Sequence, residues 1–120
     1  DPGLLMWDMR RNLDPTPMPD RRCVIQFLYP EQPAAKRRWW LIFDPGEEVD
    51  LCSVDPGFDV DLHVATDLRT MTSVWMGLTT IEAEAERGHV RAEGDRRLAR
   101  SMQTWLGLSP FSQERKRVAG

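Results

Sequence analysis

Two carboxylates and an imidazole on one face of a predicted strand could hold a metal ion. Asp59, Asp61 and His63 alternate with apolar residues, so their side chains point the same way from an extended chain. The same pattern is typical of the solvated outer face of an antiparallel sheet, which we favour. His89 is the one other histidine of the sequence, and no Cys-x-x-Cys pair accompanies it. The sequence therefore predicts no metal site.

Candidates for catalysis are equally sparse. A nucleophilic serine, threonine or cysteine needs a base that a third group orients, and the sequence offers two histidines and no Gly-x-Ser-x-Gly turn. Glu82, Glu84 and Glu86 could act as acid–base carboxylates, but they alternate along a predicted surface helix, where charge is normally solvated. No glycine-rich phosphate loop is present in the sequence. We expect a protein that is not an enzyme and that uses no cofactor.

Length, charge and cysteine content narrow the class of protein. The 120 residues are 41% hydrophobic and 29% charged, which fits one globular domain with one core. The net charge of −3 disfavours direct nucleic-acid binding, because attraction to phosphate needs a basic face. No apolar run approaches the roughly 20 residues that cross a bilayer, and no signal peptide is recognisable. With Cys23 and Cys52 alone, we expect buried thiols in a cytoplasmic protein.

Basic residues near the end of the chain could meet a membrane surface or an acidic partner. They are Arg96, Arg97, Arg100, Arg115, Lys116 and Arg117. We favour a solvated helix face followed by a disordered tail, and we expect no membrane contact.

Five short runs rich in β-forming residues predict a sheet. The runs are Arg22–Tyr29, Arg38–Phe43, Glu48–Val54, Asp59–Ala65 and His89–Glu93. Two Asp-Pro-Gly turns separate the second, third and fourth runs, which predicts a three-stranded antiparallel meander. In the fourth run, Val60, Leu62 and Val64 alternate with polar residues, so we expect all three to point into the core.

Apolar stripes with a 3.6-residue period predict the helices. One stripe is Leu68, Met71, Val74 and Trp75, and the last is Leu98, Met102, Trp105 and Leu106. Between them, Thr79 and Glu82 match a capping box that opens a short helix, with Ile81 and Ala85 as its inward pair.

Helix boundaries and connectors complete the predicted arrangement. Asp95 and Gly107 should bound the last helix, and a first helix is expected over Gly3–Leu13. Prolines at positions 15, 17 and 19 predict a stiff connector after it. We therefore predict an α+β fold, with a mainly antiparallel five-stranded sheet covered on one face by helices. One domain should span residues 1–112, including a helix and connector in 1–20, before a disordered tail in 113–120.

Heavy use of tryptophan and methionine is the most suggestive apolar feature. The sequence holds five tryptophans and six methionines, and Met71, Trp75, Met102 and Trp105 fall on inward helical stripes. Such side chains can line an adaptable ligand pocket. They can equally fill an ordinary core, which composition alone favours.

The ordered set of motifs resembles a known domain family. Residues 59–77 read DVDLHVATDLRTMTSVWMG, and residues 79–102 read TTIEAEAERGHVRAEGDRRLARSM. Both segments resemble the sterol carrier protein type 2 domain, and the meander before them fits the same fold. The matching residues are Asp67, Leu68, Gly77, Gly88, Val90, Gly94 and Leu98.

A narrower likeness spans nearly the whole chain. LLMWDMRRNLD, RRCVIQF, RRWWLIFDPGEEVDLCSVDPGFDVDL and WLGLSPF look like the C-terminal half of HxlR-type bacterial transcriptional regulators, which place a winged helix-turn-helix first. A chain that begins at Asp1 is expected to be an excised piece of such a protein. DNA would then be bound through the missing N-terminal part. The sequence lacks the peroxisome-address tripeptide of eukaryotic carriers and ends in Val118-Ala119-Gly120.

The resemblance implies a cavity between sheet and helices for a small apolar or lipid-like molecule. The residues we expect in its wall are Val60, Leu62, Val64, Met71, Val74, Trp75, Ile81, Leu98, Met102, Trp105 and Phe111. Phe111, after Pro110, could fold back as a lid. Burying about 200 Å² of apolar ligand surface would contribute roughly 5 kcal/mol before the costs of association, which suits micromolar sensing.

The resulting hypothesis is a ligand-sensing, regulatory domain of a bacterial transcription factor. A bound effector would favour one packing of the closing helix and alter coupling to the DNA-binding half. The alternatives are a structural or dimer-forming module with a filled core and no ligand, and an enzyme or freestanding lipid carrier. A possible homodimer is the expected assembly.

Overall fold

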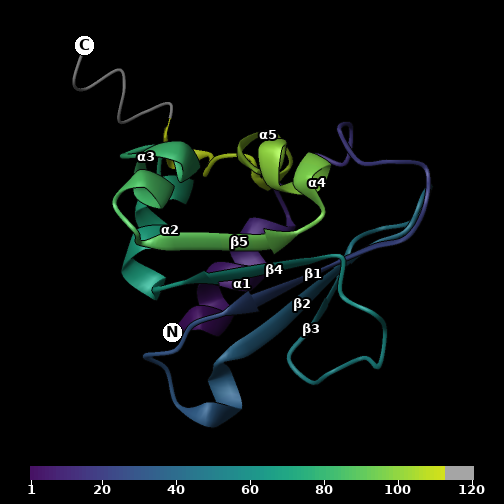
Figure 1. Ribbon diagram of the computed structural model, residues 1–120, viewed down its shortest axis with the longest axis horizontal. Helices are drawn as coiled ribbons and strands as arrows, with labels where there is room; N and C mark the ends of the chain where they lie inside the picture. Colours follow the sequence, from purple (N-terminus) through teal and green to yellow (C-terminus); the bar gives the residue numbers. More distant parts are fainter. Residues whose placement is uncertain (113–120) are drawn as a thin grey trace.

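The computed structural model describes residues 1–112, which form one mixed five-stranded sheet and its covering helices (Figure 1). The predicted tail and the basic residues beyond position 112 lie outside the described residues. The helices are α1 (Pro2–Arg10), α2 (Leu68–Trp75), α3 (Ile81–Glu86), α4 (Arg96–Arg100) and α5 (Met102–Leu106), with a 3₁₀ turn, η1, at Ala34–Lys36. The strands are β1 (Cys23–Leu28), β2 (Arg38–Phe43), β3 (Asp50–Cys52), β4 (Leu62–Thr66) and β5 (Val90–Gly94).

Strand order in the sheet is β3-β2-β1-β4-β5, and every neighbouring pair except β1–β4 is antiparallel. The α+β class and the mainly antiparallel sheet are therefore confirmed. The predicted meander is wrong at its third strand, because β4 crosses to the far side of β1 and pairs with it in parallel. A parallel neighbour needs a long connection rather than a tight hairpin. Residues 53–61, which include the second Asp-Pro-Gly turn, form that connection.

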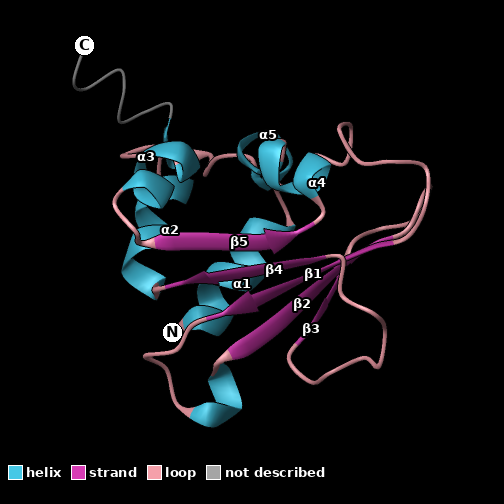
Figure 2. Ribbon diagram, in the orientation of Figure 1, coloured by secondary structure: helices cyan, strands magenta, loops and turns pink. Residues whose placement is uncertain are grey.

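Helices gather on one face of the sheet, and the main core lies between the two layers (Figure 2). Trp105 is fully buried at its centre, and its ring meets Phe27 and Phe43 edge-on at centroid distances of 6.5 and 5.9 Å. Its indole N–H donates to the carbonyl oxygen of Leu98 at 2.9 Å, so the polar atom is satisfied. Large side chains therefore fill the middle of the layer.

The opposite face carries a smaller apolar cluster. Val24, Trp40 and Ile42 are buried there, with Cys52 and Val60 packed against them. The prediction that Val60 shares the face of Leu62 and Val64 is wrong. β4 begins at Leu62, so Val60 precedes the pleated alternation and turns to the other side of the sheet.

One thiol and one carboxylate also depart from expectation. Cys23 is fully buried, whereas Cys52 is half-buried, and both are free. Asp61 is not merely solvated, since its Oδ2 accepts the Val24 N–H at 2.8 Å and its Oδ1 accepts from Arg21 at 3.2 Å. This carboxylate joins the start of β4 to β1.

Side-chain caps fix where α2, α3 and α4 begin. Asp67 and Asp95 cap α2 and α4 by accepting from the backbone N–H three residues on. Thr80 caps α3 instead of Thr79, and the third residue after it is Ala83, so the predicted capping box of Thr79 and Glu82 is wrong. The predicted last helix is broken at Ser101 into α4 and α5, although its four apolar residues are all fully buried.

Gly94 allows the end of β5 to approach β4 closely. Its φ is +128°, and a Cβ there would collide with the carbonyl oxygen of Asp61. The approach matters because Asp95, the next residue, caps α4, which starts at Arg96. Among residues 1–112, no helix is long and apolar enough to cross a membrane.

Candidate functional site

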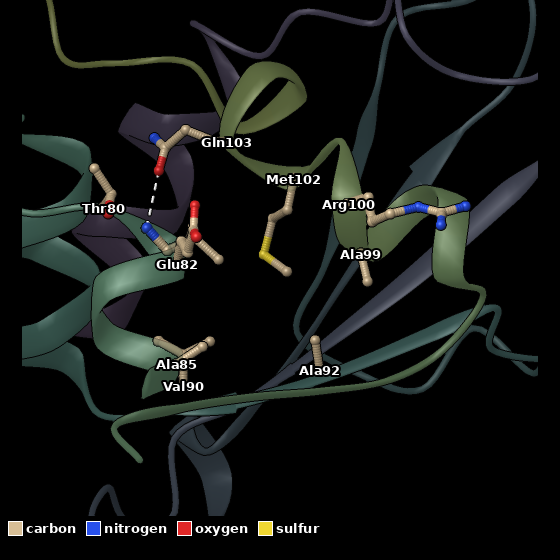
Figure 3. A pocket seen from close by; sticks show the side chains of 10 residues that line it. Thr80, Glu82, Ala85, Val90, Ala92, Ala99, Arg100, Met102 and Gln103 are labelled. Carbon is tan, nitrogen blue, oxygen red and sulfur yellow. Dashed lines mark hydrogen bonds between the residues drawn. The ribbon is translucent and has the colours of Figure 1, made fainter. Parts of the chain in front are cut away.

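A groove opens between α3, the edge strand β5 and the α4–α5 pair (Figure 3). Its volume is about 540 Å³. Its walls are formed by Thr80, Ile81, Glu82, Ala85, Val90, Ala92, Ala99, Arg100, Met102 and Gln103. Because Val90 also belongs to the main core, the groove is a lateral extension of that core toward solvent.

Small side chains are the reason that the groove stays open. Ala85, Ala92 and Ala99 line it from α3, β5 and α4, where larger residues would meet in the middle (Figure 3). Ala85 was predicted to point inward as a core residue, and instead it is exposed at the wall. Buried side chains of Ile81 and Met102 provide apolar surface at the same wall. The result is a mostly apolar concavity of the kind that holds small ligands.

One hydrogen bond ties the two helical sides of the groove together. The side-chain Oε1 of Gln103 on α5 accepts the backbone N–H of Ile81, the first residue of α3, at 2.9 Å (Figure 3). Charged groups lie only at the rim, where Glu82 and Arg100 are exposed. The bond satisfies a free N–H of the first helical turn and fixes the spacing between α3 and α5.

Behind the groove, a buried carboxylate anchors α3. Glu84 is 6% exposed, which overturns the prediction that all three α3 glutamates are solvated. It accepts from Thr79 Oγ1 at 2.6 Å, contacts His89 Nδ1 at 2.8 Å and pairs with Arg87. The Thr79 hydrogen bond, helped by His89 and Arg87, lowers the pKa of Glu84 to about 2. This carboxylate therefore joins α3 to the residue just before β5.

A polar hollow of about 450 Å³ lies next to this anchor. It is lined by Asp67, Arg69, Thr70, Ser73, Leu78, Thr79, Glu84 and His89. The carboxylates of Glu84 and Asp67 that line it are already engaged in hydrogen bonds with Thr79, His89 and Thr70. Within residues 1–112, no group of three or more metal-ligating side chains comes together.

The residues expected to line a cavity fall into different places. Ile81 and Met102 line the groove. Leu62, Val64, Met71, Val74, Trp75, Leu98 and Trp105 belong to the packed core. Val60 lies on the opposite face of the sheet, and Phe111 is 64% exposed and does not line the groove as a lid.

Several residues that line the groove were not predicted from the sequence, above all Val90, Ala92 and Ala99. Their signal was present, because alanines recur where α3, β5 and α4 should face one another. Among residues 1–112, one buried side-chain nitrogen has no hydrogen-bond partner. The indole N–H of Trp75 is buried and makes no hydrogen bond within the described residues.

No protein-family model matches the sequence, and no curated protein matches it. Solved structures do. The sec-alkylsulfatase Pisa1 from a Pseudomonas species matches 82% of this chain with a TM-score of 0.63 and 15% identity. The chain covers 15% of that enzyme's length.

Solved structures of sterol carrier proteins match over most of both chains. Sterol carrier protein 2 like 2 from Aedes aegypti has a TM-score of 0.58 and 19% identity, covering 84% of this chain and 92% of that one. A solution structure of the palmitated protein from the same organism has a TM-score of 0.53 and 21% identity, covering 78% and 79%. The chain therefore has the α+β fold of sterol carrier protein 2, as the motif pattern predicted.

Proposed function

We propose that this domain binds a small apolar or lipid-like molecule in the groove between α3, β5 and α4–α5. The observation that carries the proposal is a solvent-open, 540 Å³ extension of the core walled by alanine, isoleucine, valine and methionine. An acyl chain lying there would cover this apolar surface and leave a polar end near Glu82 and Arg100. The palmitated state of the mosquito protein with the same fold supports an acyl chain as the first ligand to test.

A titration with a fluorescent long-chain fatty acid tests this function. We expect saturable binding of one probe per chain in the micromolar range, with displacement by unlabelled palmitate. Native mass spectrometry of gently purified protein would identify a co-purifying molecule. A signal that does not saturate, or that palmitate cannot displace, would contradict binding in a defined groove.

We further propose that the domain is the ligand-sensing C-terminal part of a bacterial transcriptional regulator of the HxlR type. The support is the sequence likeness across α1, across β1 to the start of β4 and across residues 105–111, together with a contact path. Met102 in the groove wall and Trp105 lie on the same short helix, α5, and the Trp105 carbonyl oxygen accepts the Asp14 N–H at 2.9 Å. A ligand that shifted α5 would therefore also shift the segment that follows α1, through this hydrogen bond.

Two measurements test the regulatory role. The codons upstream of Asp1 should encode a winged helix-turn-helix; a hydrolase domain there would instead favour the arrangement of the alkylsulfatase. Hydrogen exchange should show that ligand binding protects α5 and also the backbone amides of α1. Protection confined to the groove would argue against coupling.

A structural module without a ligand is the second candidate, and the packed centre around Trp105 favours it. The fatty-acid titration separates the two. In either case we propose that the domain acts by binding rather than by catalysis, since ionisable groups stand at the rim of the groove and not within it.

A further inference from the structure

β5 is an edge strand, and no strand covers its outer side among residues 1–112 (Figure 1). Residues 91–94 are exposed. An open edge presents unpaired backbone groups and is a template for another strand. The opposite edge, β3, is only three residues long, so β5 is the longer template.

The backbone at the centre of β5 points away from the sheet. The Asp95 N–H donates to the carbonyl oxygen of Asp61 at 2.9 Å, in register with the β4–β5 ladder. Hydrogen-bonded residues alternate along an antiparallel pair, so Arg91 and Glu93 direct their backbone groups toward β4. The N–H and C=O of Ala92 therefore face the open edge.

The charges of β5 are complementary to those of a second, antiparallel β5. If two copies pair with Ala92 opposite Ala92, then Arg91 of each copy stands opposite Glu93 of the other. These are non-hydrogen-bonded pairs, in which side chains lie closest. In the single chain Arg91 and Glu93 pair with each other at 3.1 Å, both highly exposed, and could exchange partners at little cost.

The helices above β5 repeat this complementarity. Acidic α3 precedes the strand and lies over its start, while basic α4 follows it and lies over its end (Figure 1). An antiparallel partner places its basic α4 opposite acidic α3. Glu82 and Glu86 on one side, and Arg96 and Arg100 on the other, are exposed and make no ion pair within residues 1–112.

We propose that two copies of this chain associate through their β5 edges, with Ala92 on the two-fold axis. The shared sheet would have ten strands, and each copy would stand beside the open side of its partner's groove, because Val90 and Ala92 line that groove. A second copy of this chain is the occupant to which the charge pattern points. The proposal does not depend on any ligand.

Charge reversal tests the interface by sedimentation equilibrium. The variants R91E and E93R each place two like-charged pairs across the axis and should weaken dimerisation about tenfold or more. The double variant R91E/E93R restores opposite charges and should dimerise like the original chain. All these side chains are exposed, so thermal unfolding of the separated monomers should be unchanged.

Hydrogen exchange provides a second readout. The Ala92 amide should become protected as protein concentration rises, whereas the amides of Arg91 and Glu93, bonded to β4, should be protected at every concentration. A chain that stays monomeric at millimolar concentration would overturn the proposal. A dimer whose dissociation constant is unchanged by R91E and by E93R would show that β5 does not form the interface.

Discussion

The centre of the sheet and its β5 edge meet the same layer of helices, but one is filled and the other is open. At the centre, Trp105 packs edge-on against Phe27 and Phe43 and satisfies its own N–H. At the edge, the small side chains of Ala85 and Ala92 line a groove of about 540 Å³. Side-chain volume, and not backbone topology, decides which part of the fold has room to bind a ligand.

The comparison also separates what stabilises the domain from what gives it a function. The centre buries large apolar groups and must account for most of the folding free energy. The groove leaves apolar surface in contact with solvent, which costs stability and is useful only if something covers it. The two regions should therefore respond in opposite ways to changes in side-chain size.

Truncation at the centre should have the largest effect. Trp105→Ala removes a fully buried indole and leaves a cavity, so we expect a loss of about 3–5 kcal/mol in the free energy of unfolding. Urea unfolding followed by circular dichroism measures it. A loss below about 1 kcal/mol would mean that the centre is not tightly packed.

Enlargement at the groove should act on binding and not on stability. Ala85→Phe fills the concavity from an exposed position and should weaken fatty-acid binding at least tenfold, about 1.4 kcal/mol. Its unfolding free energy should change by less than about 0.5 kcal/mol. Ala35→Phe, at an exposed alanine outside the groove, is the matched control and should bind normally. Equal affinities for both variants would place the ligand elsewhere.

The cap of α3 offers a smaller change beside the groove. The Thr80 side chain accepts the Ala83 N–H at 3.1 Å, so Thr80→Ala should cost about 1 kcal/mol and loosen the α3 wall. Thr104→Ala, at an exposed position of α5, should lie within about 0.5 kcal/mol of the original chain. Thermal unfolding distinguishes them, and identical midpoints would contradict the capping role.

Glu84, which anchors α3 behind the groove, should make the free energy of unfolding depend on pH in the acid range. The pKa of Glu84 is about 2 in the folded chain against an ordinary 4.5, so its stabilisation is present above about pH 4.5 and is lost as the pH falls toward 2. Glu84→Gln should lower stability at neutral pH and flatten this slope. Glu82→Gln, at an exposed position of the same helix, should leave the slope unchanged.

The sequence predicted the elements better than their arrangement. The sequence predicted a segment for each of the five strands, and buried stripes such as that of Leu98 and Met102 were read directly from their spacing, although η1 was not predicted and α4 and α5 were predicted as one helix. The parallel β1–β4 pairing could not be read, since local patterns do not specify which strand becomes a neighbour. Nor could the break at Ser101, where both halves keep their apolar faces buried.

The site was predicted in part, for a physical reason. A search for large apolar residues finds the packed core, and Trp105 and Leu62 were found in this way. An opening is made by residues that are too small to close it, and the recurrence of Ala92 and Ala99 on neighbouring elements gains meaning only once those elements are known to meet. Glu84 was misjudged because its partners Thr79 and His89 come from outside its own helix.

The central claim is that an apolar ligand enters the groove at the β5 edge and not the packed centre. The most direct measurement is NMR of the chain labelled with ¹³C at its methionine methyl groups, titrated with palmitate. Met102 is buried but also lines the groove, whereas Met6, Met9 and Met71 are buried in the core and do not line the groove. We predict a saturable shift of the Met102 methyl signal with small changes at the other three. Saturation that shifts Met71 and leaves Met102 unmoved would contradict the account.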